Sequence, residues 1–172
     1  KSPGDSFSAE VSMDTGENKV TGVDIKLKFD PSALEIVSIT KGAGIAVFDQ
    51  IIANTFSNSL GTVSFIAFTL DRTKAVQGSG LSVLNISAKV KENANPAAYQ
   101  ISFEGGTAVA GVGEGQNVLI NSTSGRINVA GGGTPTATQT ATPTATPTST
   151  PTSAPNTGGG GATPTPNPTS TP

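Results

Sequence analysis

The sequence predicts an all-β fold of about nine strands, arranged as a sandwich or jelly roll and followed by an extended Pro/Thr-rich C-terminal tail. Apolar and polar residues alternate with a period of two, and β-branched residues dominate the apolar positions. Clusters of Gly, Asn and Pro separate the apolar runs, and no long window shows helical spacing. We expect one sandwich domain over residues 1–130, then a Gly hinge and a linker over residues 131–172.

The first two expected strands each have one solvent-facing side. Residues 7–13 alternate Phe, Ala, Val and Met with Ser and Glu, and residues 23–29 alternate Val, Ile, Leu and Phe with Asp and Lys. Residues 14–19 between them are rich in turn-forming types. The two strands are therefore expected to run antiparallel or to lie in different sheets.

Seven further apolar runs complete the expected set of strands. They are residues 34–39, 46–57 with a break, 62–70, 81–90, 99–103, 118–120 and 126–129. The runs at 62–70 and 81–90 carry bulky apolar residues on both faces, which is typical of central strands covered on both sides. Expected core residues are Phe29, Leu34, Val63, Phe65, Ile86 and Phe103.

The tail has a different composition from the rest of the chain. Nine of the twelve prolines lie from Thr134 onward, where there is no charged residue and no Leu, Ile, Val or Phe. Such a segment cannot offset its ordering entropy by burial, so an extended, semi-rigid spacer is expected. Uncharged Thr and Ser beside Pro are typical of O-glycosylated stalks. The expected sugar-bearing residues are Thr134, Thr136, Thr138, Thr140, Thr142, Thr144, Thr146, Thr148, Thr150 and Thr152.

Composition excludes several classes of function. The chain has no Cys and no His, which excludes thiolate or imidazole metal sites, disulfides and Ser/His catalysis, and no cofactor is expected. A net charge of −2 with scattered basic residues indicates no nucleic-acid partner. No apolar run is long enough to span a membrane. A start at Lys1 without Met indicates a mature or excised chain.

Candidate chemical sites are few. Asp14, Glu17 and Asn18 could supply oxygen ligands to Ca²⁺, although a turn alone would have the same composition, and both interpretations stay open. No carboxylate pair stands out for glycoside hydrolysis, so no enzyme activity is expected. The chain has no Trp and one Tyr, Tyr99, which disfavours a polysaccharide-binding module because sugars stack on aromatic rings.

Four stretches together resemble the cohesin family over about residues 4–129. They are Gly-Val-Asp-Ile-Lys-Leu-Lys-Phe-Asp-Pro at 22–31 followed by Leu-Glu-Ile-Val-Ser-Ile at 34–39, Gly-Thr-Val-Ser-Phe at 61–65, Leu-Asn-Ile-Ser-Ala-Lys-Val-Lys at 84–91, and Ala-Tyr-Gln-Ile-Ser-Phe at 98–103. The resemblance implies a nine-stranded β-sandwich with jelly-roll topology. It also implies a non-catalytic receptor that grips a calcium-binding helical partner, the dockerin, on a flat sheet face. Asp24 falls where cellulosomal cohesins often place an aspartate that hydrogen-bonds the dockerin, and Gly22 replaces an amide residue.

The expected function is that of a non-catalytic, extracellular or cell-surface interaction module presented on a Pro/Thr stalk. Its protein partner would be a dockerin-like module, or copies of the chain itself in a polymer, and the face containing Asp24 would bind it. The alternative is a glycosylated structural subunit of an extracellular filament or surface layer. A polysaccharide-binding module ranks below both.

Overall fold

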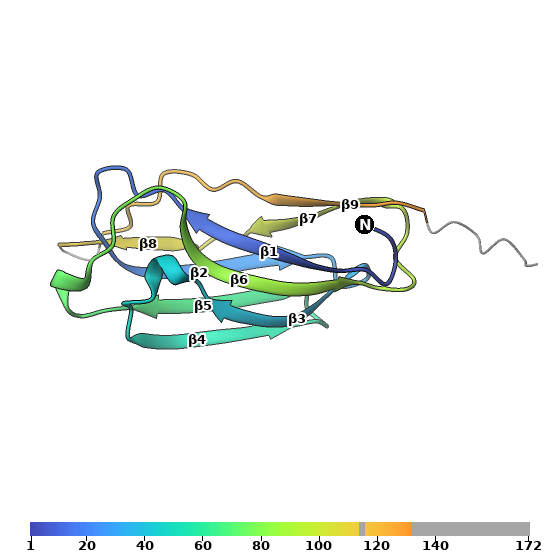
Figure 1. Cartoon of the computed structure of the whole chain (residues 1–172), viewed down its shortest axis with the longest axis horizontal. Coiled ribbons are helices and arrows are strands. Elements are labelled where there is room, and N and C mark those ends of the chain that lie inside the picture. The colour runs from blue at the N-terminus through green and yellow to red at the C-terminus, as the bar shows by residue number, and fades with distance from the viewer. Residues whose placement is uncertain (114–115, 132–172) are drawn as a thin grey trace, which may run out of the picture. The chain divides into compact units, whose positions relative to one another are not determined.

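Two antiparallel sheets face each other in the computed structural model, which describes residues 1–113 and 116–131 (Figure 1). The elements are β1 (Ser6–Met13), β2 (Val20–Phe29), β3 (Leu34–Lys41), η1 (Ala43–Ile45), β4 (Gln50–Ser57), β5 (Thr62–Phe68), η2 (Arg72–Lys74), β6 (Leu81–Val90), β7 (Ala97–Phe103), β8 (Ala108–Gly111) and β9 (Gly125–Val129). The predicted all-β sandwich is confirmed. The threonines expected to carry sugars, Thr134 to Thr152, lie outside the described residues.

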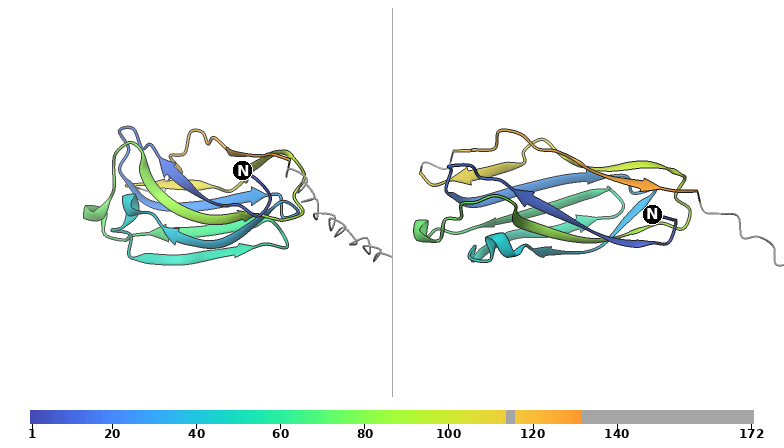
Figure 2. Two further views of the ribbon diagram at one scale, coloured as in Figure 1. Left: turned by 45° about the vertical axis from the view of Figure 1, so that its right-hand side comes forward. Right: turned by 45° about the horizontal axis from the view of Figure 1, so that its top comes forward.

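The smaller sheet has three strands in the order β1-β6-β3, and the larger has the order β4-β5-β2-β7-β9, with β8 also paired to β2. Figure 2 shows the two layers from two further directions. β1 and β2 belong to different sheets, so the second of the two expected arrangements is the observed one. The chain crosses from one sheet to the other after β1, β2, β3, β5 and β6, and such crossings are typical of a jelly roll.

The core lies between the two sheets and follows the period-two pattern. Five of the residues expected there are buried: Phe29, Leu34, Val63, Phe65 and Ile86. Phe103 packs against this core but is only half-buried, because it lines an open groove between the sheets. Ile66 and Phe68 of β5 point to the opposite face and are half-buried there. β5 is therefore an internal strand with apolar side chains on both faces, as its sequence predicts, but among the described residues only its core-facing side is covered by the other sheet.

The run expected at residues 46–57 begins later than its apolar residues indicate. The short helix η1 comes first, and β4 starts only at Gln50. Gly42 and Gly44 lie so close to the backbone of Ser82 and Leu81 that an added Cβ on either glycine would overlap those atoms. This close approach turns the chain away from β6 and across to the other sheet before β4 begins.

The prediction of a strand at residues 118–120 is wrong. Residues 118–120 are irregular, and the strand beside β2 is β8, formed by the smaller residues Ala108 to Gly111. The side chain of Asn117 replaces a regular ladder here, because its Oδ1 accepts from the backbone N–H of Val109 at 2.9 Å and of Leu119 at 3.0 Å. Val118 and Leu119 pack against the core, the N–H of Val118 donates to the carbonyl of Val109 at 2.8 Å, and Ile120 is exposed.

Candidate functional site

The larger sheet has one face that the smaller sheet does not cover, and we call it the outer face. Side chains alternate along each strand, so the residues between the core positions project here. They are Gly22, Asp24, Lys26 and Lys28 on β2, Thr62, Ser64, Ile66 and Phe68 on β5, and Ala108 and Ala110 on β8. Except for Gly22, which is buried, and Lys28, which is exposed, these residues are all half-buried. Five of these ten residues are Gly, Ala, Ser or Thr, so half of the face is made of small side chains.

Asp24 lies at the centre of the outer face, opposite Ile66 on β5 and Ala108 on β8. Its side chain is 29% exposed, and its Oδ2 lies 3.4 Å from the Nζ of Lys26. Its Oδ1 is buried and has no hydrogen-bond partner among the described residues. A buried acceptor left without a donor costs about 1–3 kcal/mol, so this oxygen is a site where an added donor is stabilising.

The surroundings of Asp24 are apolar and closely packed. Gly22, the neighbouring outer-face residue on β2, lies beside Phe68 and Ala110. A Cβ added at Gly22 would lie 3.0 Å from the Cβ of Phe68 and 3.5 Å from that of Ala110. Glycine therefore lets these two side chains approach each other across β2. The result is an apolar floor beside a single carboxylate.

The edge strand β4 carries exposed apolar side chains, of which Ile51 and Phe56 pair with the core residues Ala67 and Val63 and so lie on the core-facing side of the sheet. Its pairing with β5 has a bulge between Ile51 and Ala53, which leaves Ile52 without a partner residue. Ile52 is 70% exposed, and Ile51 and Phe56 are also exposed. Bulges often redirect side chains and stop further pairing at sheet edges. Large exposed apolar groups at such a position are typical of contact surfaces.

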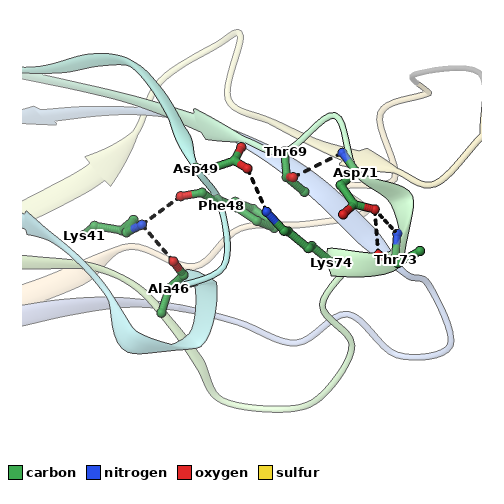
Figure 3. Close-up of polar contacts among 8 residues, drawn as sticks. All are labelled: Lys41, Ala46, Phe48, Asp49, Thr69, Asp71, Thr73 and Lys74. Carbon is green, nitrogen blue, oxygen red and sulfur yellow. Dashed lines mark hydrogen bonds and ion pairs between the residues drawn. The ribbon is translucent and has the colours of Figure 1, made fainter.

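A polar cluster fixes the end of the sheet at which Gln50 pairs with Phe68 (Figure 3). The Nζ of Lys74 in η2 lies 2.9 Å from the Oδ2 of Asp49, which directly precedes β4. This contact lowers the pKa of Asp49 and raises that of Lys74. The pair joins η2 to the start of β4, but both groups are exposed, so it contributes little to overall stability.

Two more contacts hold this end of the sheet in place. The Nζ of Lys41 donates to the carbonyls of Ala46 and Phe48, at 3.0 and 2.8 Å, and so secures the turn before β4. Asp71 caps η2, because its Oδ1 accepts from the backbone N–H and the hydroxyl of Thr73. These hydrogen bonds lower the pKa of Asp71. The cluster positions β4 and is structural.

Of the three residues that could supply oxygen ligands to Ca²⁺, Asp14, Glu17 and Asn18, the first is engaged in hydrogen bonds within the protein. The Oδ1 of Asp14 accepts from the Ser79 hydroxyl at 2.7 Å and from the Gly80 N–H at 2.6 Å, which lowers its pKa. Glu17 and Asn18 are exposed in the same turn. Within residues 1–113 and 116–131, no three acidic side chains gather into a group that could hold a metal ion. The turn interpretation of Asp14 accounts for its contacts.

Sequence reasoning placed Asp24 on a sheet face but missed its neighbours on β8 and β4. Ala108 and Ala110 have a period-two spacing after the turn at Gly105 and Gly106, which was the available signal for a short strand. The exposure of Ile52 depends on a bulge, and no sequence pattern marks its position. In the described part of the chain, no helix is long and apolar enough to cross a membrane.

A protein-family model described as "Cohesin domain" matches residues 1–129. The fold is similar to a cohesin of Clostridium thermocellum solved in the Coh-OlpA–Doc918 complex, with 14% identity and a TM-score of 0.64 over 75% of this chain and 92% of that one. It is similar to the third ScaC cohesin of Acetivibrio cellulolyticus, solved with the ScaB dockerin, with 19% identity and a TM-score of 0.64 over 75% and 92%. A non-cellulosomal cohesin of the archaeon Archaeoglobus fulgidus shares 12% identity with a TM-score of 0.58 over 75% and 83%. No curated protein matches the chain.

Proposed function

Because the chain belongs to the cohesin family, we propose that residues 1–130 form a non-catalytic docking module whose outer face binds a dockerin-like protein. Asp24 is the observation that carries the proposal. A carboxylate with one buried oxygen, which has no partner among the described residues, lies on the outer face between the apolar side chains of Ile66 and Ala108. Two of the similar structures were solved as complexes with dockerins, which supports this class of partner.

The outer face indicates what a partner must present. A hydrogen-bond donor is needed over Asp24, since the carboxylate is acceptor-only when ionised. Apolar side chains of the partner would cover Ile66, Phe68 and the exposed Ile52. An amphipathic helix with a hydroxyl, amide or ammonium group among its apolar residues has this combination.

Residues 131–172 serve in this proposal as an O-glycosylated spacer that presents the module outside the cell or at its surface. The composition of the segment supports this role, because alternating Thr and Pro keep a chain extended without a packed core. A spacer of this kind separates the docking module from its attachment point. It leaves the outer face open to a large partner.

A structural role is the second candidate. The exposed Ile51, Ile52 and Phe56 on the edge strand β4 favour it, because unpaired edges with apolar side chains promote contacts between copies. In that case the chains would assemble into a filament or surface layer. Sedimentation of the full chain over a range of concentrations separates the two: a monomer at all concentrations supports docking, and concentration-dependent growth supports assembly.

The proposed function is tested by calorimetric titration of the full chain with a panel of calcium-loaded dockerins. We expect saturable binding to at least one dockerin. The matched variants Asp24→Ala on the outer face and Glu35→Ala on the solvent side of β3 then locate the interface. Absence of binding across a broad panel, with a folded chain, would contradict the proposal.

A further inference from the structure

The segment between β8 and β9 contains a run with the acceptor pattern of N-glycosylation, Asn-x-Ser/Thr with x other than Pro. It is Asn-Ser-Thr at residues 121–123. A second run with this pattern, Asn-Ile-Ser, occupies residues 85–87 in β6. A three-residue pattern also arises by chance, so its surroundings in the fold decide what it can do. The structure places the two runs in very different surroundings.

The run at 121–123 lies in an exposed and irregular stretch. Residues 121–124 have no regular secondary structure, and all four are exposed. Acceptor runs that are modified lie in the surface loops of secreted proteins, because the amide and the hydroxyl two residues later must enter the site of a transferase together. A surface loop permits this without loss of core packing. The geometry of residues 121–124 meets this requirement.

Asn117, four residues earlier, shows what an asparagine does when the fold uses it. Its Oδ1 accepts from the backbone N–H of Val109 at 2.9 Å and of Leu119 at 3.0 Å. Leu119 also stands two residues after it, so Asn117 is not in an acceptor run. The hydrogen bonds that hold this segment among the described residues do not involve the amide of Asn121. Modification of Asn121 therefore removes no contact on which the fold depends.

Ile120, directly before Asn121, gives an independent reason for a bulky polar group at this position. Its side chain is 92% exposed, the largest exposed fraction of any large apolar side chain in the described part of the chain. An apolar group that projects into water promotes contacts with other proteins. A glycan on the next residue is bulky and solubilising, so it would shield Ile120 from such contacts.

Asn85 has the same pattern but is held in the middle strand of the smaller sheet. It is paired with Glu10 of β1 on one side and with Thr40 of β3 on the other. Its side chain is exposed, yet both ladders fix the backbone of the run on the sheet. Entry of residues 85–87 into a transferase site would break hydrogen bonds to both neighbouring strands. In the folded protein, Asn121 is therefore the better acceptor.

We propose that Asn121 carries an N-linked glycan, with Thr123 as the hydroxyl residue of the acceptor run. In the transfer, the Nδ2 of Asn121 forms a bond to the anomeric carbon of a sugar carried by a glycosyl phosphate or diphosphate donor. The bond from that carbon to the phosphate oxygen breaks, and the phosphate leaves with the electron pair. One amide proton passes to a base of the transferase. The proposal rests on the extracellular location proposed above and not on docking.

The test is glycopeptide mass spectrometry of protein from its native source. Electron-based fragmentation keeps a sugar on the side chain that bears it, so it distinguishes Asn121 from the neighbouring Ser122 and Thr123. We expect sugar on Asn121 and a much lower occupancy of Asn85, which is the matched control within the same chain. Only bare Asn121 in these peptides would overturn the proposal. Equal occupancy of Asn85 and Asn121 would also overturn it, because exposure in the loop would then not select the site.

Variants of the full chain, made in the native source, test the roles of the individual residues. Asn121→Gln and Thr123→Ala should each abolish the sugar on this peptide, whereas Thr123→Ser should retain it. Asn121→Gln should also self-associate at lower concentration than wild type, and Ile120→Thr in the same chain should reverse this. Sugar that persists on the peptide of Asn121→Gln would contradict attachment at this amide. Calorimetric titration with dockerins has no part in these readouts, so failure of docking and failure of this proposal are distinguishable.

Discussion

Asp24 on β2 lies directly opposite Ile66 on β5, so the carboxylate at the centre of the outer face has an aliphatic neighbour on one side and Ala108 on the other. Neither neighbour can donate a side-chain hydrogen bond, and the Oδ1 of Asp24 has no partner among the described residues. Lys26, two residues along the strand, reaches only the other oxygen. An unmet acceptor in an apolar surrounding distinguishes this residue from the ordinary carboxylates at the strand ends.

Phe65 should be among the residues on which the fold depends most. It is fully buried on β5 and pairs with Ile25 of β2. Phe65→Ala should lower the free energy of unfolding by about 3–5 kcal/mol, because it removes the ring and leaves a cavity between the sheets. Urea unfolding measures the change, and Phe56→Ala on the edge strand is the control with a smaller expected loss. A loss below about 1 kcal/mol at Phe65 would contradict the assigned packing.

Gly61 and Gly80 form a matched pair for separating backbone strain from steric overlap. Both have positive φ, +68° and +64°, which costs a substituted residue about 1–2 kcal/mol. A Cβ at Gly61 would also overlap the carbonyl oxygen of Phe29, whereas nothing lies within 4 Å of a Cβ at Gly80. Thermal unfolding should therefore show a clearly larger loss for Gly61→Ala than for Gly80→Ala. Equal losses of stability would mean that the turn at Gly61 shifts enough to relieve the overlap with Phe29 at no cost.

Stability should fall in acid, in part through four exposed carboxylates. Hydrogen bonds lower the pKa of Asp14, Asp30, Asp49 and Asp71. A folded-state pKa below the unfolded value stabilises the folded chain at neutral pH, and this contribution is lost as the pH falls through the folded pKa, below about pH 4. The difference in melting temperature between wild type and Asp14→Asn should shrink between pH 7 and pH 3. A difference that does not change with pH would show that ionisation of Asp14 has no role.

The tail should carry sugars in native material. Thr134, Thr136, Thr138, Thr140, Thr142, Thr144, Thr146, Thr148, Thr150 and Thr152 are the expected positions, of which we predict that several are occupied. Intact mass spectrometry should show a ladder of masses above the 17.1 kDa of the bare chain. Removal of O-glycans should collapse the ladder. A single mass at the bare value would refute glycosylation of this segment.

Local patterns predicted most of the strands, because period-two alternation with one buried face is a property of consecutive residues. The runs around Phe29 and Phe65 are examples, and both residues lie in the core. Residues 118–120 misled the prediction because they are bulky and apolar, and two of them are β-branched, whereas the strand that pairs with β2 here is β8, which is made mostly of small residues. The side chain of Asn117 stabilises this arrangement, because it accepts hydrogen bonds from Val109 of β8 and from Leu119. Such contacts are not visible in a local sequence pattern.

The candidate site was predictable only in part. Resemblance located Asp24, and its alternation with Val23 and Ile25 placed it on the solvent side of a strand. The missing donor for its Oδ1 depends on Ile66 and Ala108, which come from strands far away in the sequence. The groove between β1 and β9 likewise depends on the separation of strands from opposite ends of the domain. Features of this kind can be identified only when the pairing of the strands in both sheets is known.

The most direct test of the outer face as a docking surface is titration of wild type, Asp24→Ala and Glu35→Ala with the dockerin that binds wild type most tightly. We predict that Asp24→Ala weakens binding by about 1–3 kcal/mol, since it removes a charge-assisted hydrogen bond, while its melting temperature stays close to that of wild type. Glu35→Ala, on the smaller sheet, should bind as wild type does. Equal affinity of Asp24→Ala and wild type, or a loss confined to Glu35→Ala, would contradict the account and move the interface away from this face.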